Sequence, residues 1–411
     1  MRILLANHTS AWSGAEVSLM RLVAGLRDDH DVCIACPDSG RLAKEVDRNG
    51  IQRMPLPMVD ASLRPHPVQT PKGLGQLGAG GFALAKAARR FKADVIHANT
   101  PRVGLMAPIA RRRGAPPIVV RAHEHIPLTQ MGRSVRSVIV HTASAVAAVS
   151  DFTAERFNEG LPHPVATRVY NSIDHARFDP ARVSPAPVRE ELGLAPDAAL
   201  IGQIAQITEW KGHDTAIRAL AELRGFGLDA HLLVVGQIAF GGKGVRYDNH
   251  AFMRTLEELI DELSVRHAVH FLGQRRDVPE IMRALDLTLL PSWEEPFGLV
   301  TVESMALGTP PLVSANGAGP ELVDDGVTGR LLPPKQASAW AAAARELLED
   351  RAALRRMGAA GPAAAAPFRD ARHAGQMLAV FERAIAEPSP GRTPAPMAAP
   401  ARTEDRAAWR S

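Results

Sequence analysis

The order of apolar and amphipathic segments is the feature that most constrains this chain. Short apolar runs of strand length alternate with longer amphipathic segments through both halves of this 411-residue chain. Such alternation is typical of parallel sheets covered by helices on both faces. The expected strands are Ile3–Ala6, Val32–Cys36, Asp94–Ala98, Ile118–Arg121 and Val146–Val149 in the first half, and Leu200–Ile204, His231–Val235, Val269–Leu272, Leu287–Leu290 and Pro311–Val313 in the second. The fold class is therefore predicted to be α/β.

The segments between these runs are mostly predicted to be helices. The clearest periodicity lies in Glu16–Leu26, Gly104–Arg112, Asp214–Leu223, Met253–Leu263 and Ser338–Leu348. One segment, Gly73–Gly81, is rich in glycine but lacks the spacing of a phosphate-binding loop. We predict that it is a flexible connection.

The length of the chain predicts two domains, because a single hydrophobic core rarely grows to this size. Phe178–Pro187 has the proline and serine density of a linker. We therefore expect a first domain over 1–180 and a second over 181–370. The amphipathic segment 371–386 is predicted to be a closing helix, and the Pro/Ala-rich tail 387–411 is predicted to be disordered.

The apolar runs also bear on location. They are far shorter than the roughly 20 residues of a membrane-spanning helix. The N-terminal run Met1–Ala6 is too short for the apolar region of a signal peptide. These features predict a cytoplasmic protein.

Charge is distributed unevenly along the chain. Residues 1–180 contain 23 Lys and Arg against 15 Asp and Glu, whereas the remainder contains 25 against 29. The basic clusters Lys86–Lys92 and Arg111–Arg113 are interpreted first as solvated helix faces. Anionic lipid headgroups, and so a peripheral contact at the inner membrane face, or a phosphorylated acceptor are the alternatives. Aromatic residues make up only 5% of the chain and do not interleave with the arginines, which argues against a nucleic-acid partner.

Three short motifs suggest metal or redox chemistry, and each has a simpler interpretation. Cys33 and Cys36 lie in an expected buried strand and are interpreted as core thiols. Asp29-His-Asp31 spells a D-x-D motif but joins a helix to a strand at the wrong edge of the sheet, so it is interpreted as a turn. Adjacent side chains in His123-Glu124-His125 diverge at a strand end. No metal site is expected.

The strongest candidate for chemistry follows the expected strand Leu287–Leu290. In doubly wound sheets, ligands bind at the carboxyl ends of the strands. The loop after this strand opens a helix, and the amides of Phe297, Gly298 and Leu299 are expected to be free donors for phosphate or sugar oxygens. Glu295 and Glu303 would repel a phosphate unless they accept hydrogen bonds from hydroxyls. The pattern predicts a ligand that carries both a diphosphate and sugars.

These residues resemble a known family. Glu295-Pro-Phe-Gly-Leu-Val-Thr-Val-Glu303 is similar to the paired-glutamate motif of glycosyltransferase family 4. The surrounding blocks also resemble the family in order: Phe271-Leu-Gly273, Asp277-Val-Pro279, Ala284-Leu-Asp286, Pro291-Ser292, Glu303-Ser-Met-Ala-Leu-Gly308, Glu321 and Asp325-Gly-Val-Thr-Gly329. Several ordered blocks over about 60 residues are far more specific than two glutamates alone.

Other parts of the chain resemble the same family. Lys211 matches a lysine that the family places on the donor diphosphate, but Gln206 stands where the family has an arginine. Ser13-Gly14-Ala15-Glu16 resembles the family's Gly-Gly-Ala-Glu loop, which faces the donor phosphates and the acceptor, with Ser13 in place of the first glycine. His123 resembles the strand-end histidine that meets the transferred sugar.

The resemblance implies the GT-B architecture, in which two Rossmann-like domains face a central cleft, and a retaining, metal-independent glycosyltransferase that needs no cofactor. The donor would be a nucleotide sugar, and the acceptor a carbohydrate or a lipid-linked molecule in polysaccharide or glycolipid synthesis. In this interpretation Glu303 binds the ribose, Glu295 a sugar hydroxyl, and Lys211 with the amides near Gly298 the diphosphate. His123, Lys211 and Glu295 are the predicted catalytic residues.

Two alternatives remain open. A nucleotide-sugar 2-epimerase has the same architecture and also grips a nucleotide diphosphate. A non-catalytic nucleotide-sugar-binding protein is conceivable because Gln206 and Ser13 depart from the family pattern.

Overall fold

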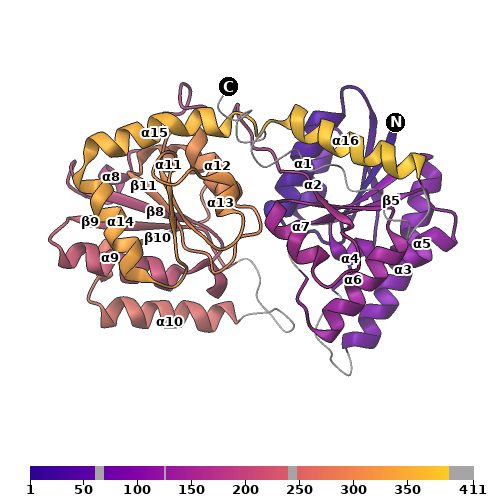
Figure 1. The fold of residues 1–411 in the computed structure, drawn as a ribbon, viewed down its shortest axis with the longest axis horizontal. Coiled ribbons are helices and arrows are strands. Elements are labelled where there is room, and N and C mark those ends of the chain that lie inside the picture. The colour runs from indigo at the N-terminus through magenta and orange to yellow at the C-terminus, as the bar shows by residue number, and fades with distance from the viewer. Residues whose placement is uncertain (61–68, 125, 239–247, 388–411) are drawn as a thin grey trace. The chain divides into compact units, whose positions relative to one another are not determined.

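The chain folds into two compact units. The computed structural model describes residues 1–60, 69–124, 126–238 and 248–387 (Figure 1). Unit 1 comprises Met1–Ser172 and the segment from Phe368 onward, and unit 2 comprises Ile173–Pro367. Each unit contains one parallel sheet with helices on both faces. The prediction of two Rossmann-like parallel-sheet domains is confirmed.

The sheet of unit 1 has seven parallel strands in the order β3-β2-β1-β4-β5-β6-β7. Their bounds are β1 (Arg2–Ala6), β2 (Asp31–Cys36), β3 (Gln52–Pro55), β4 (Val95–Ala98), β5 (Ile118–Ala122), β6 (Ala145–Ala148) and β7 (Ala166–Arg168). β1 pairs with β2 on one side and β4 on the other. The strand order reverses between β1 and β4, so the loops after these strands diverge and leave a crevice at their carboxyl ends.

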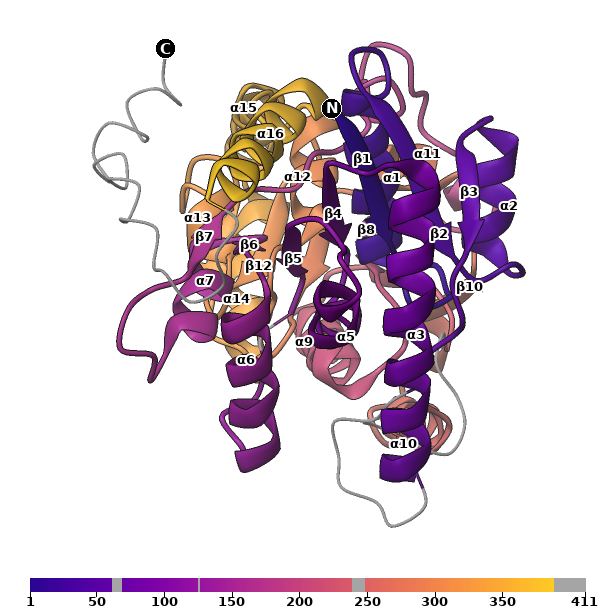
Figure 2. The same ribbon diagram turned by 90° about the vertical axis from the view of Figure 1, so that its right-hand side faces the viewer.

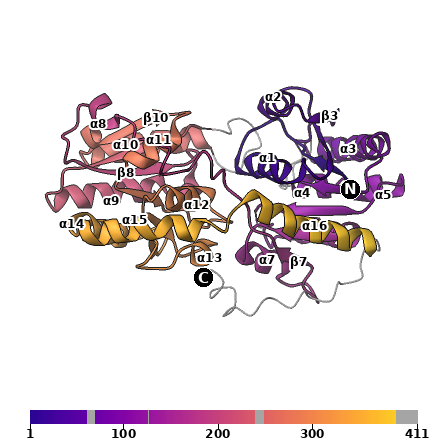
Figure 3. The same cartoon turned by 90° about the horizontal axis from the view of Figure 1, so that it is seen from above.

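The helices of unit 1 include one that is distant in sequence. Their bounds are α1 (Gly14–Leu26), α2 (Arg41–Arg48), α3 (Gln69–Phe91), α4 (Pro101–Gly104), α5 (Ala107–Arg112), α6 (Gln130–Thr142), α7 (Asp151–Asn158) and α16 (Asp370–Ala386). α16 lies in the segment predicted to be a closing helix and runs beside α1 (Figure 3). Arg21 on α1 pairs with Asp370, and Met377 and Phe381 are fully buried in unit 1. The rest of the predicted tail lies outside the described residues from 388 onward.

The glycine-rich segment 73–81 was predicted to be a flexible connection, and that prediction is wrong. It lies inside α3, which runs beside α5 (Figure 2). A Cβ atom on Gly80 would lie 2.9 Å from the Met106 side chain, and one on Gly81 would lie 2.7 Å from Ile109 Cβ. Glycine is thus required here for close packing between helices, at the usual cost in helix propensity.

The sheet of unit 2 has six parallel strands in the order β10-β9-β8-β11-β12-β13. Their bounds are β8 (Ala199–Ile204), β9 (Ala230–Val235), β10 (Val269–Gly273), β11 (Leu287–Leu290), β12 (Pro311–Ser314) and β13 (Arg330–Leu332). Here the order reverses between β8 and β11. The loops after β8 and β11 therefore flank the position where such sheets bind ligands.

The helices of unit 2 cover both faces of this sheet. Their bounds are α8 (Val188–Glu191), α9 (His213–Gly225), α10 (Asn249–Glu262), α11 (Val278–Ala284), α12 (Leu299–Ala306), α13 (Gly319–Leu322), α14 (Ala337–Glu349) and α15 (Arg351–Ala365), with 3₁₀ turns η1 (Glu209–Lys211) and η2 (Arg266–Ala268). α12 packs closely on α15, because a Cβ atom on Gly361 would lie 2.5 Å from the Met305 carbonyl oxygen.

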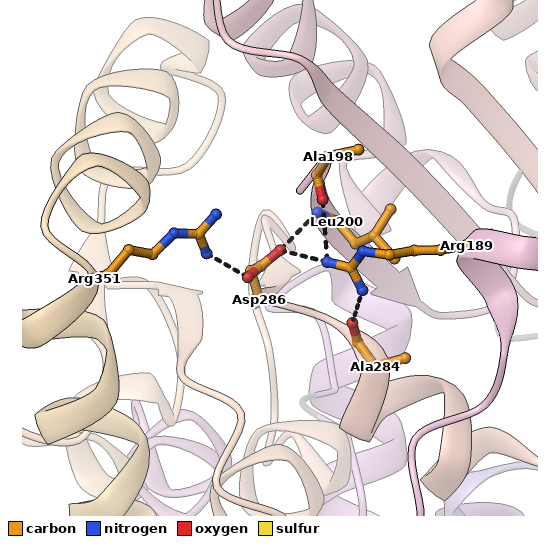
Figure 4. Close-up of polar contacts among 6 residues, drawn as sticks. All are labelled: Arg189, Ala198, Leu200, Ala284, Asp286 and Arg351. Carbon is orange, nitrogen blue, oxygen red and sulfur yellow. Dashed lines mark hydrogen bonds and ion pairs between the residues drawn. The ribbon is translucent and has the colours of Figure 1, made fainter. Parts of the chain in front are cut away.

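Asp286 bonds to several elements at one edge of this sheet (Figure 4). This edge is opposite to the one where the ligand site is expected. Its Oδ2 accepts hydrogen bonds from Leu200 N at 2.8 Å and Arg189 Nη2 at 3.2 Å, and its Oδ1 accepts one from Arg351 Nη1 at 2.5 Å. Arg189 also donates to the carbonyl oxygens of Ala198 and Ala284. Asp286 thus joins α8, the start of β8 and α15, which gives this acid a structural role.

The cysteine pair and the D-x-D motif, which were not expected to be metal or redox sites, lie at structural positions. Cys33 and Cys36 are buried free thiols, and burial raises their pKa values to about 12 and about 11. Asp29-His-Asp31 connects α1 to β2, with His30 N bonded to the Leu26 carbonyl. His125 lies outside the described residues. None of the helices in the described ranges has both the length and the apolar character needed to cross a bilayer.

Candidate functional site

The strand order of unit 2 reverses between β8 and β11, and this place is the switch point of its sheet. The loops after β8 and β11 are held together there. Trp293 N donates to the Trp210 carbonyl oxygen at 2.8 Å. Gly212 has φ +69°, and a Cβ atom there would lie 2.2 Å from the Pro291 carbonyl oxygen. Only glycine allows both the left-handed conformation and this close approach. The two loops therefore form one unit of structure, although they are about 80 residues apart in sequence.

Lys211 and Glu295 meet where these loops join. Lys211 Nζ lies 2.6 Å from Glu295 Oε2, and both side chains are largely buried, with 19% and 14% of their surfaces exposed. Ser292 Oγ donates to the same Glu295 oxygen at 2.9 Å. Lys211 Nζ also lies 4.0 Å from the centre of the Trp210 ring. The structure thus brings two of the three predicted catalytic residues into direct contact.

The backbone of Glu295 is held by the loop that follows β12. Glu295 N donates to the Asn316 carbonyl oxygen at 3.3 Å, and Ala318 N donates to the Glu295 carbonyl oxygen at 2.8 Å. Gly317 has φ +113°, and a Cβ atom there would lie 2.3 Å from the Glu295 carbonyl oxygen. These contacts fix the backbone of Glu295, and the bonds from Lys211 and Ser292 hold its carboxylate, so the carboxylate is positioned before any ligand binds.

The start of α12 presents backbone donors beside this pair. Gly298 is the N-cap residue, with φ +91°. In the described part of the chain, the amides of Gly298 and Leu299 have no hydrogen-bond partner. Phe297 is buried, with 4% of its surface exposed, and anchors the turn. Free amides at a helix N-terminus suit an anionic or strongly polar ligand.

Glu303 lies on α12, about one turn after the start of this helix. Burial raises its pKa to about 7; Arg177 opposes this shift and Asp174 adds to it. A carboxyl group with this pKa changes charge near neutral pH, which is typical of functional sites but not restricted to them.

Gln206 lies in the loop after β8, which is held by the loop after β9. Ala205 N and Ile207 N donate to the carbonyl oxygens of Val235 and Gln237. The Gln206 side chain is half-buried and makes no hydrogen bond to another described residue. Among residues 205–212 and 291–298, Lys211 is the only basic residue. Lys211 is therefore the cation that these two loops themselves supply for a diphosphate.

The remaining predicted residues lie in unit 1. Ser13 precedes α1, and both its amide and its hydroxyl donate to Glu16 Oε2, at 2.8 Å and 2.6 Å. Gly14 is exposed in the first turn of α1. The bond from the Ser13 amide to the Glu16 side chain is one of the two bonds of a capping box. This arrangement places the helix N-terminus directly after β1, at the switch point of this sheet.

His123 follows β5 at the same edge of the sheet. Its Nε2 lies 3.1 Å from Asn99 Oδ1. Burial lowers the pKa of His123 far below its ordinary value, and the charge of Arg121 lowers it further, as do His97 and His373. Arg121 itself is buried, which lowers its pKa to about 9. His123 is therefore neutral at physiological pH.

The predicted residues thus form two groups. Lys211, Glu295, Gln206, Glu303 and the amides of 297–299 surround the switch point of unit 2, and Ser13, Gly14 and His123 lie at the carboxyl edge of unit 1. The roles assigned to them stay predictions. The sequence reasoning missed several polar neighbours: Asn7, Asn99, Ser292 and Asn316. Asn7 and Asn99 directly follow β1 and β4, so the rule that ligands bind at the carboxyl ends of the strands could have found them.

Comparison with known proteins identifies the family in both halves of the chain. Residues 12–177 match the family model described as Glycosyltransferase Family 4, and residues 186–364 match the model described as Glycosyl transferases group 1.

Curated relatives agree. A D-inositol 3-phosphate glycosyltransferase from Nocardia farcinica is 35% identical over 291 residues, which cover 61% of this chain and 62% of the relative. One from Stackebrandtia nassauensis is 30% identical, over 74% of this chain and 71% of the relative. The match therefore spans just under two thirds of the first of these relatives.

Solved structures share the fold. Anabaena HepE, in complex with UDP and glucose, is 24% identical, with a TM-score of 0.79 over 93% of this chain and 99% of that chain. Sucrose-phosphate synthase from Thermosynechococcus elongatus is 20% identical, with a TM-score of 0.72 over 94% and 99%. The predicted GT-B fold class is thereby confirmed. With both halves matched and relatives at this level of identity, the chain belongs to glycosyltransferase family 4.

Proposed function

We propose that this protein is a retaining, metal-independent glycosyltransferase that moves a sugar from a nucleotide-diphosphate sugar to a hydroxyl group of its acceptor. The contact between Lys211 and Glu295 carries the proposal, because it places a cation and a hydroxyl acceptor together at the switch point of unit 2. The free amides of Gly298 and Leu299 lie in the adjoining turn. HepE, which has the same fold, is described in complex with UDP-glucose.

The proposed chemistry needs no protein nucleophile. The acceptor oxygen forms a bond to the anomeric carbon on the face from which the diphosphate leaves, and the bond between that carbon and the phosphate oxygen breaks. The leaving phosphate takes the proton of the acceptor hydroxyl. Negative charge grows on the diphosphate as its bond breaks, so fixed donors there stabilise the transition state more than the ground state.

Lys211 can bind Glu295 and the donor diphosphate at the same time. An ammonium group has three donors, and Glu295 uses one of them. Lys211 can therefore keep its ion pair and still donate to a donor phosphate. Glu295 would accept hydrogen bonds from the hydroxyls of the transferred sugar.

The acceptor is proposed to be a carbohydrate or a lipid-linked molecule in polysaccharide or glycolipid synthesis, at the cytoplasmic face of the membrane. The names of the relatives also make a phosphorylated polyol a candidate. A basic acceptor-side unit suits either an anionic acceptor or an anionic membrane.

A donor screen by thermal unfolding is the direct test of the proposal. A ligand that binds only the folded protein raises its unfolding temperature. At a concentration 100 times its dissociation constant, such a ligand adds about 2.7 kcal/mol to the free energy of unfolding. We expect one nucleotide sugar and its free nucleoside diphosphate to stabilise the protein, whereas nucleoside monophosphates without the second phosphate should act weakly. No shift with any nucleotide or nucleotide sugar would contradict the proposal.

Incubation with the identified donor separates the alternatives. A transferase consumes the donor only with an acceptor, and NMR of the product should show the anomeric configuration of the donor. A 2-epimerase would change the donor without an acceptor. A non-catalytic binding protein would give a thermal shift but consume no donor with any acceptor tested.

The basic surface of unit 1 supports the proposed peripheral contact with a membrane. α3, α5 and α6 contain basic residues but no Asp or Glu. Leu74 and Phe82 on α3 are 64% and 48% exposed, and Arg113 lies 4.5 Å from the centre of the Phe82 ring. Exposed apolar side chains among cations are typical of surfaces that lie on anionic lipid.

Vesicle sedimentation tests this contact. Each Lys or Arg near an anionic surface contributes about 1 kcal/mol, so a double reversal, Lys86→Glu with Arg112→Glu, should lower binding to phosphatidylglycerol vesicles by at least about tenfold. The matched control, Lys44→Glu with Arg48→Glu, changes exposed residues of α2 and should bind nearly as the unmodified protein does. Equal binding to neutral and anionic vesicles would contradict the proposal.

A further inference from the structure

A continuous chain of hydrogen bonds joins Glu16 to His123 across the switch point of unit 1. Asn7 Nδ2 donates to Glu16 Oε1 at 3.1 Å, and Asn99 Nδ2 donates to Asn7 Oδ1 at 3.0 Å. Asn99 Oδ1 then lies 3.1 Å from His123 Nε2. Glu16, Asn7 and Asn99 are buried, with 2%, 0% and 1% of their surfaces exposed. The chain links the loops after β1, β4 and β5 through direct hydrogen bonds.

The direction of each bond follows from groups that can only accept. Asn7 Nδ2 has two acceptors, the Glu16 carboxyl oxygen and the Thr9 carbonyl oxygen at 2.9 Å, so the amide nitrogen must face them. Asn7 Oδ1 is therefore the acceptor for Asn99. Asn99 Nδ2 likewise has two acceptors, Asn7 Oδ1 and the Ala15 carbonyl oxygen at 3.3 Å. The oxygen of Asn99 must then face His123.

This order determines which nitrogen of His123 carries the proton. Because Asn99 Oδ1 can only accept, His123 Nε2 must be the donor. In the neutral ring, Nδ1 is then an acceptor. Within the described residues, Nδ1 of His123 has no hydrogen-bond partner.

We propose that Asn7 and Asn99 are positioning residues that hold His123 as its Nε2–H tautomer, so that Nδ1 accepts a hydrogen bond from a substrate hydroxyl. The role in substrate binding rests on the proposed function; the tautomer does not. A phosphate oxygen cannot donate to Nδ1, so this arrangement selects a sugar or acceptor hydroxyl at His123 and leaves phosphate recognition to other groups. Glu16 acts at a distance, since its bond to Asn7 orients both amides.

The groups around His123 oppose a second proton on the ring. Arg121 lies on β5, His97 on β4 and His373 on α16, and each lowers the pKa of His123. Glu124 is the exposed neighbour in sequence. Burial is the largest cause of the lowered pKa. The His123 ring should therefore stay neutral from pH 6 to pH 8.

Nitrogen-15 NMR of the histidine rings reads the tautomer directly, whether or not a substrate is known. The signal of His123 is assigned by its loss in His123→Gln. We expect the unmodified protein to show the Nε2–H tautomer from pH 6 to pH 8, and Asn99→Ala to show a mixture of tautomers. Asn49→Ala, at an exposed asparagine of the same unit, is the matched control and should not change the spectrum. An Nδ1–H tautomer or a charged ring at pH 7 in the unmodified protein would overturn the proposal.

Kinetics test the second part of the proposal. With an identified donor, Asn99→Ala should lower kcat/KM by about 10- to 100-fold, by analogy with the groups that orient metal-ligating histidines. Asn99→Asp keeps the acceptor for Nε2 but adds a negative charge, so it should retain the tautomer and raise the pKa of His123, adding a new limb to the pH profile. Circular dichroism and thermal unfolding show whether each variant is folded.

The outcomes separate this inference from the proposed function. If His123 is the Nε2–H tautomer but the protein binds no nucleotide sugar, the positioning role of Asn7 and Asn99 stands. The proposed glycosyltransferase activity is then contradicted. Active transfer with an unchanged tautomer in Asn99→Ala would overturn the positioning role alone.

Discussion

Replacing Lys211 by alanine is expected to lower kcat by at least about 100-fold while the protein stays folded. Removing one preorganised donor from a developing negative charge costs about 3 kcal/mol of transition-state stabilisation. The effect should be at the upper end here, because Gln206 carries no charge and Lys211 is the only basic residue of the two loops. The measurement is single-turnover transfer with the donor identified by thermal unfolding.

Matched variants separate the catalytic effect of Lys211 from the structural effect of its ion pair. Lys211→Ala leaves Glu295 with its hydrogen bond from Ser292 but without a cation. Glu295→Gln removes the charge and keeps the shape, and the double variant removes both charges. If the pair were only structural, the double variant would regain activity along with stability. We expect stability to recover in the double variant while turnover stays low. Arg218→Ala, at an exposed residue of α9, controls for loss of positive charge and should keep full activity.

Gln206→Arg tests whether an added positive charge beside Lys211 strengthens binding of the donor. An arginine at this position would add a charged, bidentate donor of the kind that suits phosphates. Tighter binding of the donor in this variant would show that the uncharged glutamine limits affinity.

Glu303→Gln is expected to weaken binding of the nucleotide by about 10- to 100-fold above pH 7, and less below it. A hydrogen bond to a charged acceptor contributes about 1.5–3 kcal/mol, and an amide accepts more weakly than a carboxylate. The pKa of Glu303 is raised to about 7, so the carboxylate that is predicted to accept hydrogen bonds from the ribose is lost as the pH falls through 7. Calorimetry from pH 6 to pH 8 should show affinity falling toward low pH in the unmodified protein. The nucleotide titrates in both proteins, so the difference between them isolates Glu303.

The stability of the ligand-free protein checks the same titration independently. The pKa of Glu303 is higher in the folded protein than its ordinary value of 4.5, so the folded state binds more protons between these two pH values. The contribution of Glu303 to the free energy of unfolding should therefore fall as the pH rises from 4.5 to 7 and then level off. Glu303→Gln lacks this loss, so its advantage in stability over the unmodified protein should grow through the same window. Parallel stability curves would show that Glu303 does not titrate there.

Much of the architecture could be predicted from the sequence because it follows from local patterns. The apolar runs expected to form strands correspond to β1, β2, β4, β5, β6 and β8–β12. The short edge strands β3, β7 and β13 were missed, since only three or four residues carry their signal. α3 was missed for another reason: glycine usually interrupts a helix, and only the proximity of α5 explains its use at Gly80 and Gly81.

The sequence by itself determined the two parallel sheets, the family motifs and the edge of each sheet where the site should lie. Hydrophobic period and the polar residues after each strand are local, so they can be read before the chain is folded. Only the tertiary structure decided that Lys211 contacts Glu295, that α16 packs in unit 1, and that Asn7 and Asn99 join Glu16 to His123. These contacts join residues 9 to 349 positions apart, and strand order and packing, which no local pattern contains, bring them together.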